Sequence, residues 1–153
     1  MIMDQPRALG NRHPFLKNVS EEVTEFDDSL KEIFEVMVGV MSTSQMAAIS
    51  AIHVGMPKRA MIFAFNNQES GVQDHLFPMV NPVIIQRSTE DGFNEWYSYP
   101  GIYGDRENYA RYIVVEYQTG SGDKRKSYFA DVNAVLIQQQ IQYMDGLVEE
   151  EDT

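Results

Sequence analysis

The chain has 153 residues, a formal net charge of −11 and no cysteine. This length fits one domain with a sizeable core. The lack of cysteine excludes disulfides, thiolate metal sites and a cysteine nucleophile. The acidity argues against direct binding of nucleic acid or an anionic membrane, because phosphates repel carboxylates. Basic partners remain open, and so does the simpler interpretation that the charge only keeps the chain soluble.

The first predicted element is an amphipathic helix that follows an irregular segment, residues 1–19. Asp27 or Asp28 can cap its first turn by accepting hydrogen bonds from exposed amides. An apolar stripe follows at helical spacing, made of Leu30, Ile33, Phe34, Met37 and Met41. The helix should end near residues 42–44, whose hydroxyls compete for backbone hydrogen bonds.

Strands and a second helix follow. Residues 58–65 and 79–87 are apolar enough for strands, and Pro82 permits the second only as an edge or irregular strand. Residues 112–117 and 124–129 predict a hairpin around a Gly-rich turn. Asp131 can cap the last helix and Gly146 can end it. A helix, several strands and a helix predict an α+β domain rather than alternating βαβ units.

Three stretches resemble, in the same order, the motifs of peptide deformylases. Residues 46–55 resemble Gly-x-Gly-Leu-Ala-Ala-Pro-Gln-Val-Gly, and residues 94–101 resemble Glu-Gly-Cys-Leu-Ser-x-Pro-Gly. Residues 138–146 resemble Gln-His-Glu-x-Asp-His-Leu-Asp-Gly. The resemblance runs from about Pro14 to Gly146. The chain is similar to short members of the family, of the kind encoded by bacteriophages.

The resemblance implies a peptide deformylase-like α+β fold, in which small antiparallel sheets surround the C-terminal helix. We expect a single domain over residues 1–153. Its ends, residues 1–13 and 149–153, are expected to be flexible or bound to a partner. The first residues have no basic region followed by an apolar run, so they do not read as a secretory signal.

The chain departs from the family where the resemblance implies chemistry. In the family a cysteine and two histidines hold a metal and a glutamate moves a proton. Their places are taken by Trp96, Gln139, Tyr143 and Gln140, respectively, and His53 takes the place of the oxyanion-stabilising glutamine. An indole only donates hydrogen bonds, amides and neutral phenols are poor metal ligands, and a glutamine has no titratable proton. These replacements predict a metal-free, cofactor-free and catalytically inactive relative.

Three hypotheses about function follow. The first is a structural or protein-interaction component, bound to other protein chains in a larger assembly such as a bacteriophage baseplate or tail. The second is a module that binds peptides or nascent chains. The third, ranked last for want of a nucleophile, is an enzyme with altered chemistry. The expected location is the host cytoplasm, or the virion if a phage encodes the chain.

Several side chains have two interpretations. The aromatic segment of Trp96, Tyr97, Tyr99 and Tyr103 is either an interface or, at Trp96 together with Tyr143, packing that fills the former metal site. His53 fits a hydrogen-bonded residue of a pocket wall better than a ligand of a new metal site. We expect Gln139 or Gln140 to bond to backbone or to Tyr143, because unsatisfied buried amides are costly. The acidic helix surface is expected to be solvated; it comprises Asp27, Asp28, Glu32 and Glu35.

Overall fold

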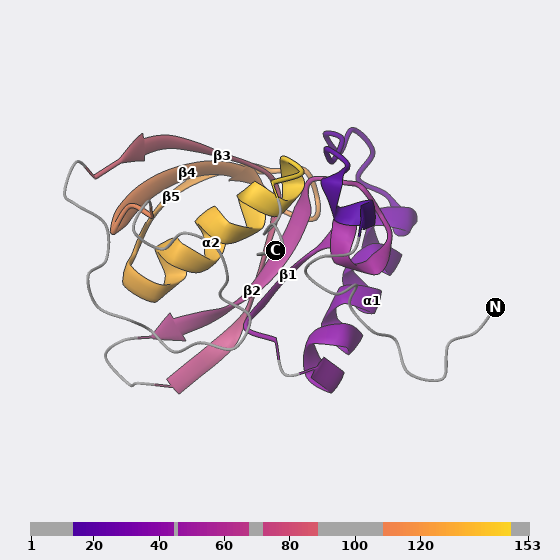
Figure 1. Cartoon of the computed structure of the whole chain (residues 1–153), viewed down its shortest axis with the longest axis horizontal. Coiled ribbons are helices and arrows are strands. Elements are labelled where there is room, and N and C mark those ends of the chain that lie inside the picture. The colour runs from indigo at the N-terminus through magenta and orange to yellow at the C-terminus, as the bar shows by residue number, and fades with distance from the viewer. Residues whose placement is uncertain (1–13, 45, 68–71, 89–108, 148–153) are drawn as a thin grey trace, which may run out of the picture.

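A computed structural model describes residues 14–44, 46–67, 72–88 and 109–147 of the chain (Figure 1). Two short 3-10 helices, two α-helices and five strands follow one another along the chain: η1 (Pro14–Lys17), α1 (Asp28–Ser44), β1 (Ala48–Ser50), η2 (Ala51–Val54), β2 (Ala60–Asn67), β3 (Val72–Arg87), β4 (Tyr112–Gln118), β5 (Lys124–Ala130) and α2 (Asp131–Met144). The aromatic segment with Trp96, Tyr97, Tyr99 and Tyr103 lies outside the described residues, as do both expected flexible ends.

The five strands form one antiparallel sheet in the order β1-β2-β3-β4-β5. This confirms the α+β class, although we expected several small sheets instead of one. Alternation along β2 explains its apolar run. Met61 and Phe63 pack in the cluster that contains α2, whereas Ala60 and Ile62 pack in the cluster that contains α1. The two helices therefore lie on opposite faces of β2 (Figure 1), and successive residues of this strand are buried on both sides.

Pro82 lies in the middle strand of the sheet, so of the two predicted alternatives, an edge strand or an irregular strand, the second holds. The predicted irregularity is confirmed, because the β3–β4 register shifts between Val80 and Val83. A bulge releases a residue from the ladder, which lets proline occupy a central strand. Asn81 beside it has a positive φ of 50°. Its side chain bonds both backbone groups of Val23, at 2.8 and 2.9 Å, and so joins the bulge to the segment before α1.

The helix boundaries agree with the sequence pattern at three of four ends. Asp27 accepts the amide of Ser29 at 3.0 Å and so caps α1. Asp131 does not cap α2 as expected: it is the first helical residue, with φ 57°, and Ala130 is the N-cap. Gly146 follows α2 with a φ of 76°, a backbone conformation that residues with a Cβ rarely adopt. None of the described helices is long and apolar enough to span a bilayer.

Candidate functional site

Three consecutive glutamines of α2 point into the protein. Gln138, Gln139 and Gln140 are each no more than 3% exposed, which confirms that part of the glutamine run points inward. Gln138 bonds both backbone groups of Ala110, donating at 2.8 Å and accepting at 2.9 Å. Its Oε1 also accepts from Arg87 at 2.8 Å. This amide therefore fixes α2 against the chain that enters β4.

Two residues further along α2, Gln140 joins a buried polar cluster that we call the Ser50 cluster: Ser50, His53, Gln140 and Tyr143. The Ser50 hydroxyl donates to Gln140 Oε1 at 2.8 Å. Of the two glutamines for which we expected a bond to backbone or to Tyr143, Gln140 bonds instead to the Ser50 hydroxyl. The rings of His53 and Tyr143 meet edge to face, with centroids 4.5 Å apart. The structure therefore brings together the residues at three of the family's functional positions.

His53 is held neutral by its surroundings. Its side chain is 1% exposed, and burial lowers its pKa to about 4 because a low-dielectric interior disfavours the charged form. The Ser50 amide donates to His53 Nδ1 at 3.2 Å. Nδ1 is then the unprotonated nitrogen and Nε2 carries the proton. The hydrogen bond expected for His53 is thereby present.

Tyr143 serves as packing. It is 5% exposed and forms a small apolar cluster with Leu16 and Ile52, against which Phe15 also packs. A large ring here avoids a cavity, whose cost grows by about 24 cal/mol per Å³. The packing interpretation of Tyr143 is thereby supported, while its expected neighbour Trp96 lies outside the described residues.

The polar atoms at the family's metal position do not fit a metal ion. At the two ligand positions that the structure describes, they are the amide of Gln139 and the neutral phenol of Tyr143, which a borderline-soft metal binds poorly. Within the described ranges, no group of three His, Cys, Asp or Glu side chains could hold a metal. We therefore derive no step of a reaction through such an ion.

Beside this cluster, the edge strand β1 directs the backbone groups of Ala48 away from its neighbour β2. The Ala64 amide donates to Ala47 O at 2.8 Å, and bonded pairs alternate along antiparallel strands. The peptide groups of Ala48 and Ser50 therefore face away from β2. The Ser50 N–H donates a hydrogen bond to His53. The N–H and C=O of Ala48 make no hydrogen bond within the part of the chain that the structure describes.

Sequence reasoning missed β1 and Ser50. A three-residue strand is too short to show a period of two, and Ser50 stands at an unremarkable position of the first motif-like stretch. The only available signal was its place three residues before His53, because side chains and backbone at that spacing can meet in a turn.

The family assignment follows from comparison with known proteins. The family model described as polypeptide deformylase matches residues 8–150. The chain belongs to this family. The Wolinella succinogenes peptide deformylase is 30% identical to this family member over 138 residues, covering 89% of this chain and 81% of the relative. The Helicobacter pylori (strain P12) peptide deformylase is 29% identical, covering 87% and 77%.

Solved deformylases have the same fold. The Thermus thermophilus enzyme matches with a TM-score of 0.74 at 25% identity, covering 94% of this chain and 82% of that one. An Acinetobacter baumannii peptide deformylase described as bound to Met-Ala-Ser matches with a TM-score of 0.78 at 21% identity, covering 95% and 97%. These matches confirm the predicted deformylase fold.

The same comparisons correct the prediction of a catalytically inactive, metal-free pseudoenzyme. The relatives of this deformylase family member are named peptide deformylases, which are enzymes, and none of these comparisons shows that this chain has lost the activity. The interpretation as a structural protein of a bacteriophage particle likewise conflicts with those names. The error lay in treating four replaced side chains as sufficient to decide the function of a whole fold.

Proposed function

We propose that this deformylase family member acts on polypeptide N-termini and binds the N-terminal segment of its substrate as an added strand along the side of β1 that faces away from β2. The relatives are named for an action on peptides, and the Acinetobacter baumannii protein with this fold is described as bound to Met-Ala-Ser. An unpaired strand edge is a general means of holding an extended peptide, because its free backbone groups bond to those of the ligand.

The outward-facing peptide groups of Ala48 carry this proposal. One donor and one acceptor at the end of a sheet suit a two-bond contact with an extended segment. The Ser50 cluster adjoins this position, since Ser50 follows Ala48 by two residues and bonds to Gln140. Ser50 donates to Gln140 Oε1, and the amide nitrogen is the group of this side chain that would donate to a carbonyl of the ligand.

The test is calorimetric titration with formyl-Met-Ala-Ser, with formate release measured in the same samples. We expect saturable binding that Ala48→Pro weakens about tenfold, since proline removes an N–H whose loss costs about 1 kcal/mol or more. The change spares the β1–β2 ladder, because that N–H faces away from β2. Ala48→Ser, which keeps the N–H, is the matched control and should bind like the unmodified chain.

A second measurement guards against misfolding of the proline variant. The same peptide, methylated on one backbone nitrogen, should bind more weakly to the unmodified chain, whose fold is not in question. Absence of saturable binding to the unmodified chain would overturn the proposal. So would undiminished affinity both of the unmodified chain for the methylated peptide and of Ala48→Pro for the unmethylated one.

A further inference from the structure

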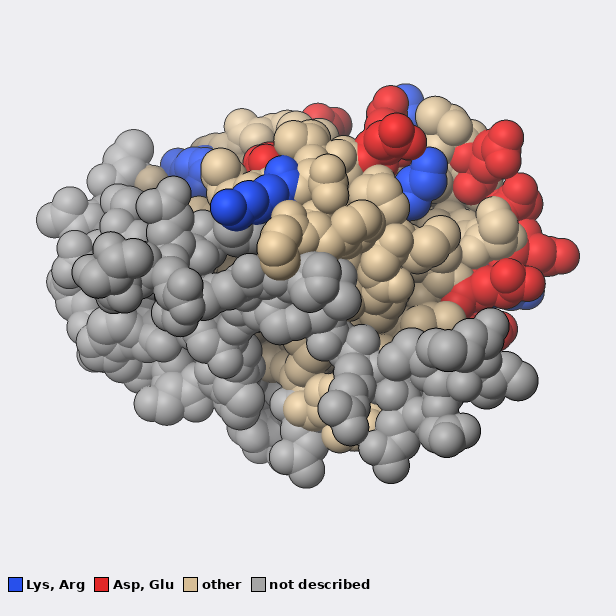
Figure 2. Space-filling model, turned by 45° about the vertical axis from the view of Figure 1, so that its right-hand side comes forward, with Lys and Arg blue, Asp and Glu red and all other residues tan. Residues whose placement is uncertain are grey.

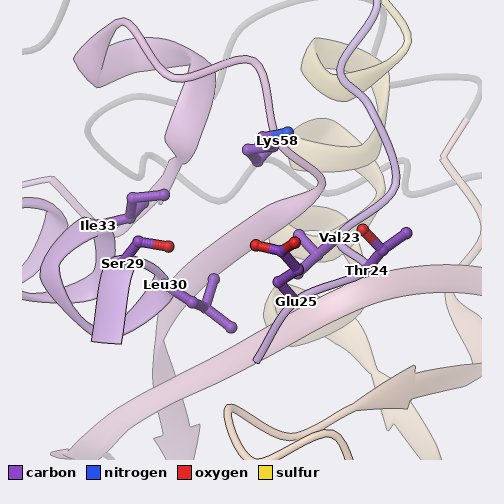
Figure 3. A pocket seen from close by; sticks show the side chains of 7 residues that line it. All are labelled: Val23, Thr24, Glu25, Ser29, Leu30, Ile33 and Lys58. Carbon is purple, nitrogen blue, oxygen red and sulfur yellow. The ribbon is translucent and has the colours of Figure 1, made fainter. Parts of the chain in front are cut away.

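A recess lies away from the Ser50 cluster, where the segment before α1 meets the first turns of that helix (Figure 3). We call it the α1 pocket. Its volume is about 240 Å³, several times the roughly 30 Å³ that one water occupies in the liquid. Seven side chains line it: Val23, Thr24, Glu25, Ser29, Leu30, Ile33 and Lys58. None of them belongs to the Ser50 cluster or to β1.

The α1 pocket combines an apolar floor with a polar rim. Val23 and Leu30 are 6% and 3% exposed and Ile33 is partly buried, all within one core cluster. Thr24, Glu25 and Ser29 on the rim are exposed, and sticks from both sides surround the recess in Figure 3. This arrangement suits one apolar side chain that inserts while its own backbone stays at the rim.

The backbone of the rim is available for such a ligand. Both peptide groups of Val23 are bonded to Asn81. Those of Thr24 and Glu25, by contrast, make no hydrogen bond among the described residues. A non-helical segment with free donors and acceptors beside an apolar floor is the pattern that binds extended peptides.

Charge around the pocket selects the kind of peptide. Residues 21–35 contain seven acidic side chains and a single lysine, which leaves a net charge of −6 out of −11 for the chain. Acidic side chains gather over one end of the molecule in Figure 2. Lys58 at the pocket is itself paired with Glu21 at 3.2 Å. Such a field attracts basic partners and repels acidic ones.

We propose that the α1 pocket docks an extended basic segment of another protein chain, with one apolar side chain on the floor and flanking lysines or arginines against the acidic rim. This interaction is separate from the proposed action on peptide N-termini, because it uses neither β1 nor the Ser50 cluster. It assigns to the acidic helix surface a role beyond solvation.

Three labelled pentapeptides test the proposal by fluorescence anisotropy on the full chain. They are acetyl-Arg-Lys-Leu-Lys-Arg-amide, the same peptide with Ser in place of Leu, and acetyl-Glu-Glu-Leu-Glu-Glu-amide. We expect the first to bind saturably. The Ser peptide should bind about tenfold more weakly, as follows from losing the burial of one leucine. The acidic peptide should not bind.

Two variants with the same charge change locate the binding. Glu25→Lys on the rim should weaken binding of the Leu peptide by about fivefold or more, since it turns an attraction into a repulsion. Glu116→Lys changes an exposed residue of β4 outside the pocket, and it should change binding by less than about twofold because salt screens distant charges.

Three outcomes would overturn the proposal. Equal binding of the Leu and Ser peptides, or equal losses in the two variants, would mean unspecific attraction to an acidic protein. Self-association of the chain in light scattering that Glu25→Lys abolishes would make a second copy the occupant.

Discussion

Acidification should destabilise the fold through His53. Its pKa is 6.5 in an unfolded chain and about 4 in the folded protein. Between these values the unfolded state binds more protons, so the free energy of unfolding rises with pH. The contribution of the neutral imidazole is therefore complete above about pH 6.5 and is lost as the pH falls toward 4.

The magnitude follows from the gap between the two pKa values. Each pKa unit is worth about 1.4 kcal/mol, which gives about 3 kcal/mol in total, of which about 2 kcal/mol is lost between pH 7 and pH 5. We expect the unfolding free energy of the unmodified chain to fall by about this amount relative to His53→Gln, which has no group to titrate there.

Urea denaturation of both proteins at half-unit pH steps measures this difference, and the comparison cancels the carboxylates that they share. His75→Gln makes the same substitution at an exposed position of β3 and supplies the baseline for losing an imidazole. Parallel curves for the unmodified chain and His53→Gln from pH 7 to pH 5 would refute the assignment of a buried neutral histidine.

Two further predictions concern stability, both measured by urea denaturation at neutral pH. Gly146→Ala should cost about 2–4 kcal/mol, because φ is 76° and a Cβ would lie 2.7 Å from a backbone oxygen. Gly55→Ala, with φ 84° but open space around the Cβ, should cost only about 1 kcal/mol; equal losses would exclude the steric contribution. Ser50→Ala should cost about 1–3 kcal/mol by leaving Gln140 Oε1 without its donor. Ser50→Ala combined with Gln140→Met should recover part of this loss, and a double variant less stable than the single one would contradict that reasoning.

Local patterns sufficed for the helices and the hairpin, because their signals lie within a few residues. The stripe from Leu30 to Met41 and the turn at residues 120–123 are confirmed by α1, β4 and β5. The pairing of β3 was not accessible in this way. β3 begins at Val72, seven residues before the predicted start, because β2 is its partner there. A proline within the run also argued against the central position that tertiary pairing imposed.

The candidate site was likewise predictable only in part from the sequence. The resemblance placed His53, Gln140 and Tyr143 near one another, and the structure confirms that proximity. It did not reveal that Ser50 would bond Gln140, since a contact across 90 residues leaves no trace in local spacing. Residue identity also overstated the functional consequence of the replacements, because chemistry belongs to an assembled site and not to single positions.

The position of α2 at the end of the described chain has a consequence for biosynthesis. Its side chains complete the cluster that covers one face of the sheet, and Met144 O accepts the Ser20 amide at 2.7 Å. The N-terminal part of a nascent chain emerges from the ribosome first, so the strands emerge before α2, which covers them. The apolar face of the strands is therefore exposed to water until α2 packs on it. Contacts of such long sequence separation form slowly. Premature termination within α2 should therefore yield aggregates rather than a smaller folded protein.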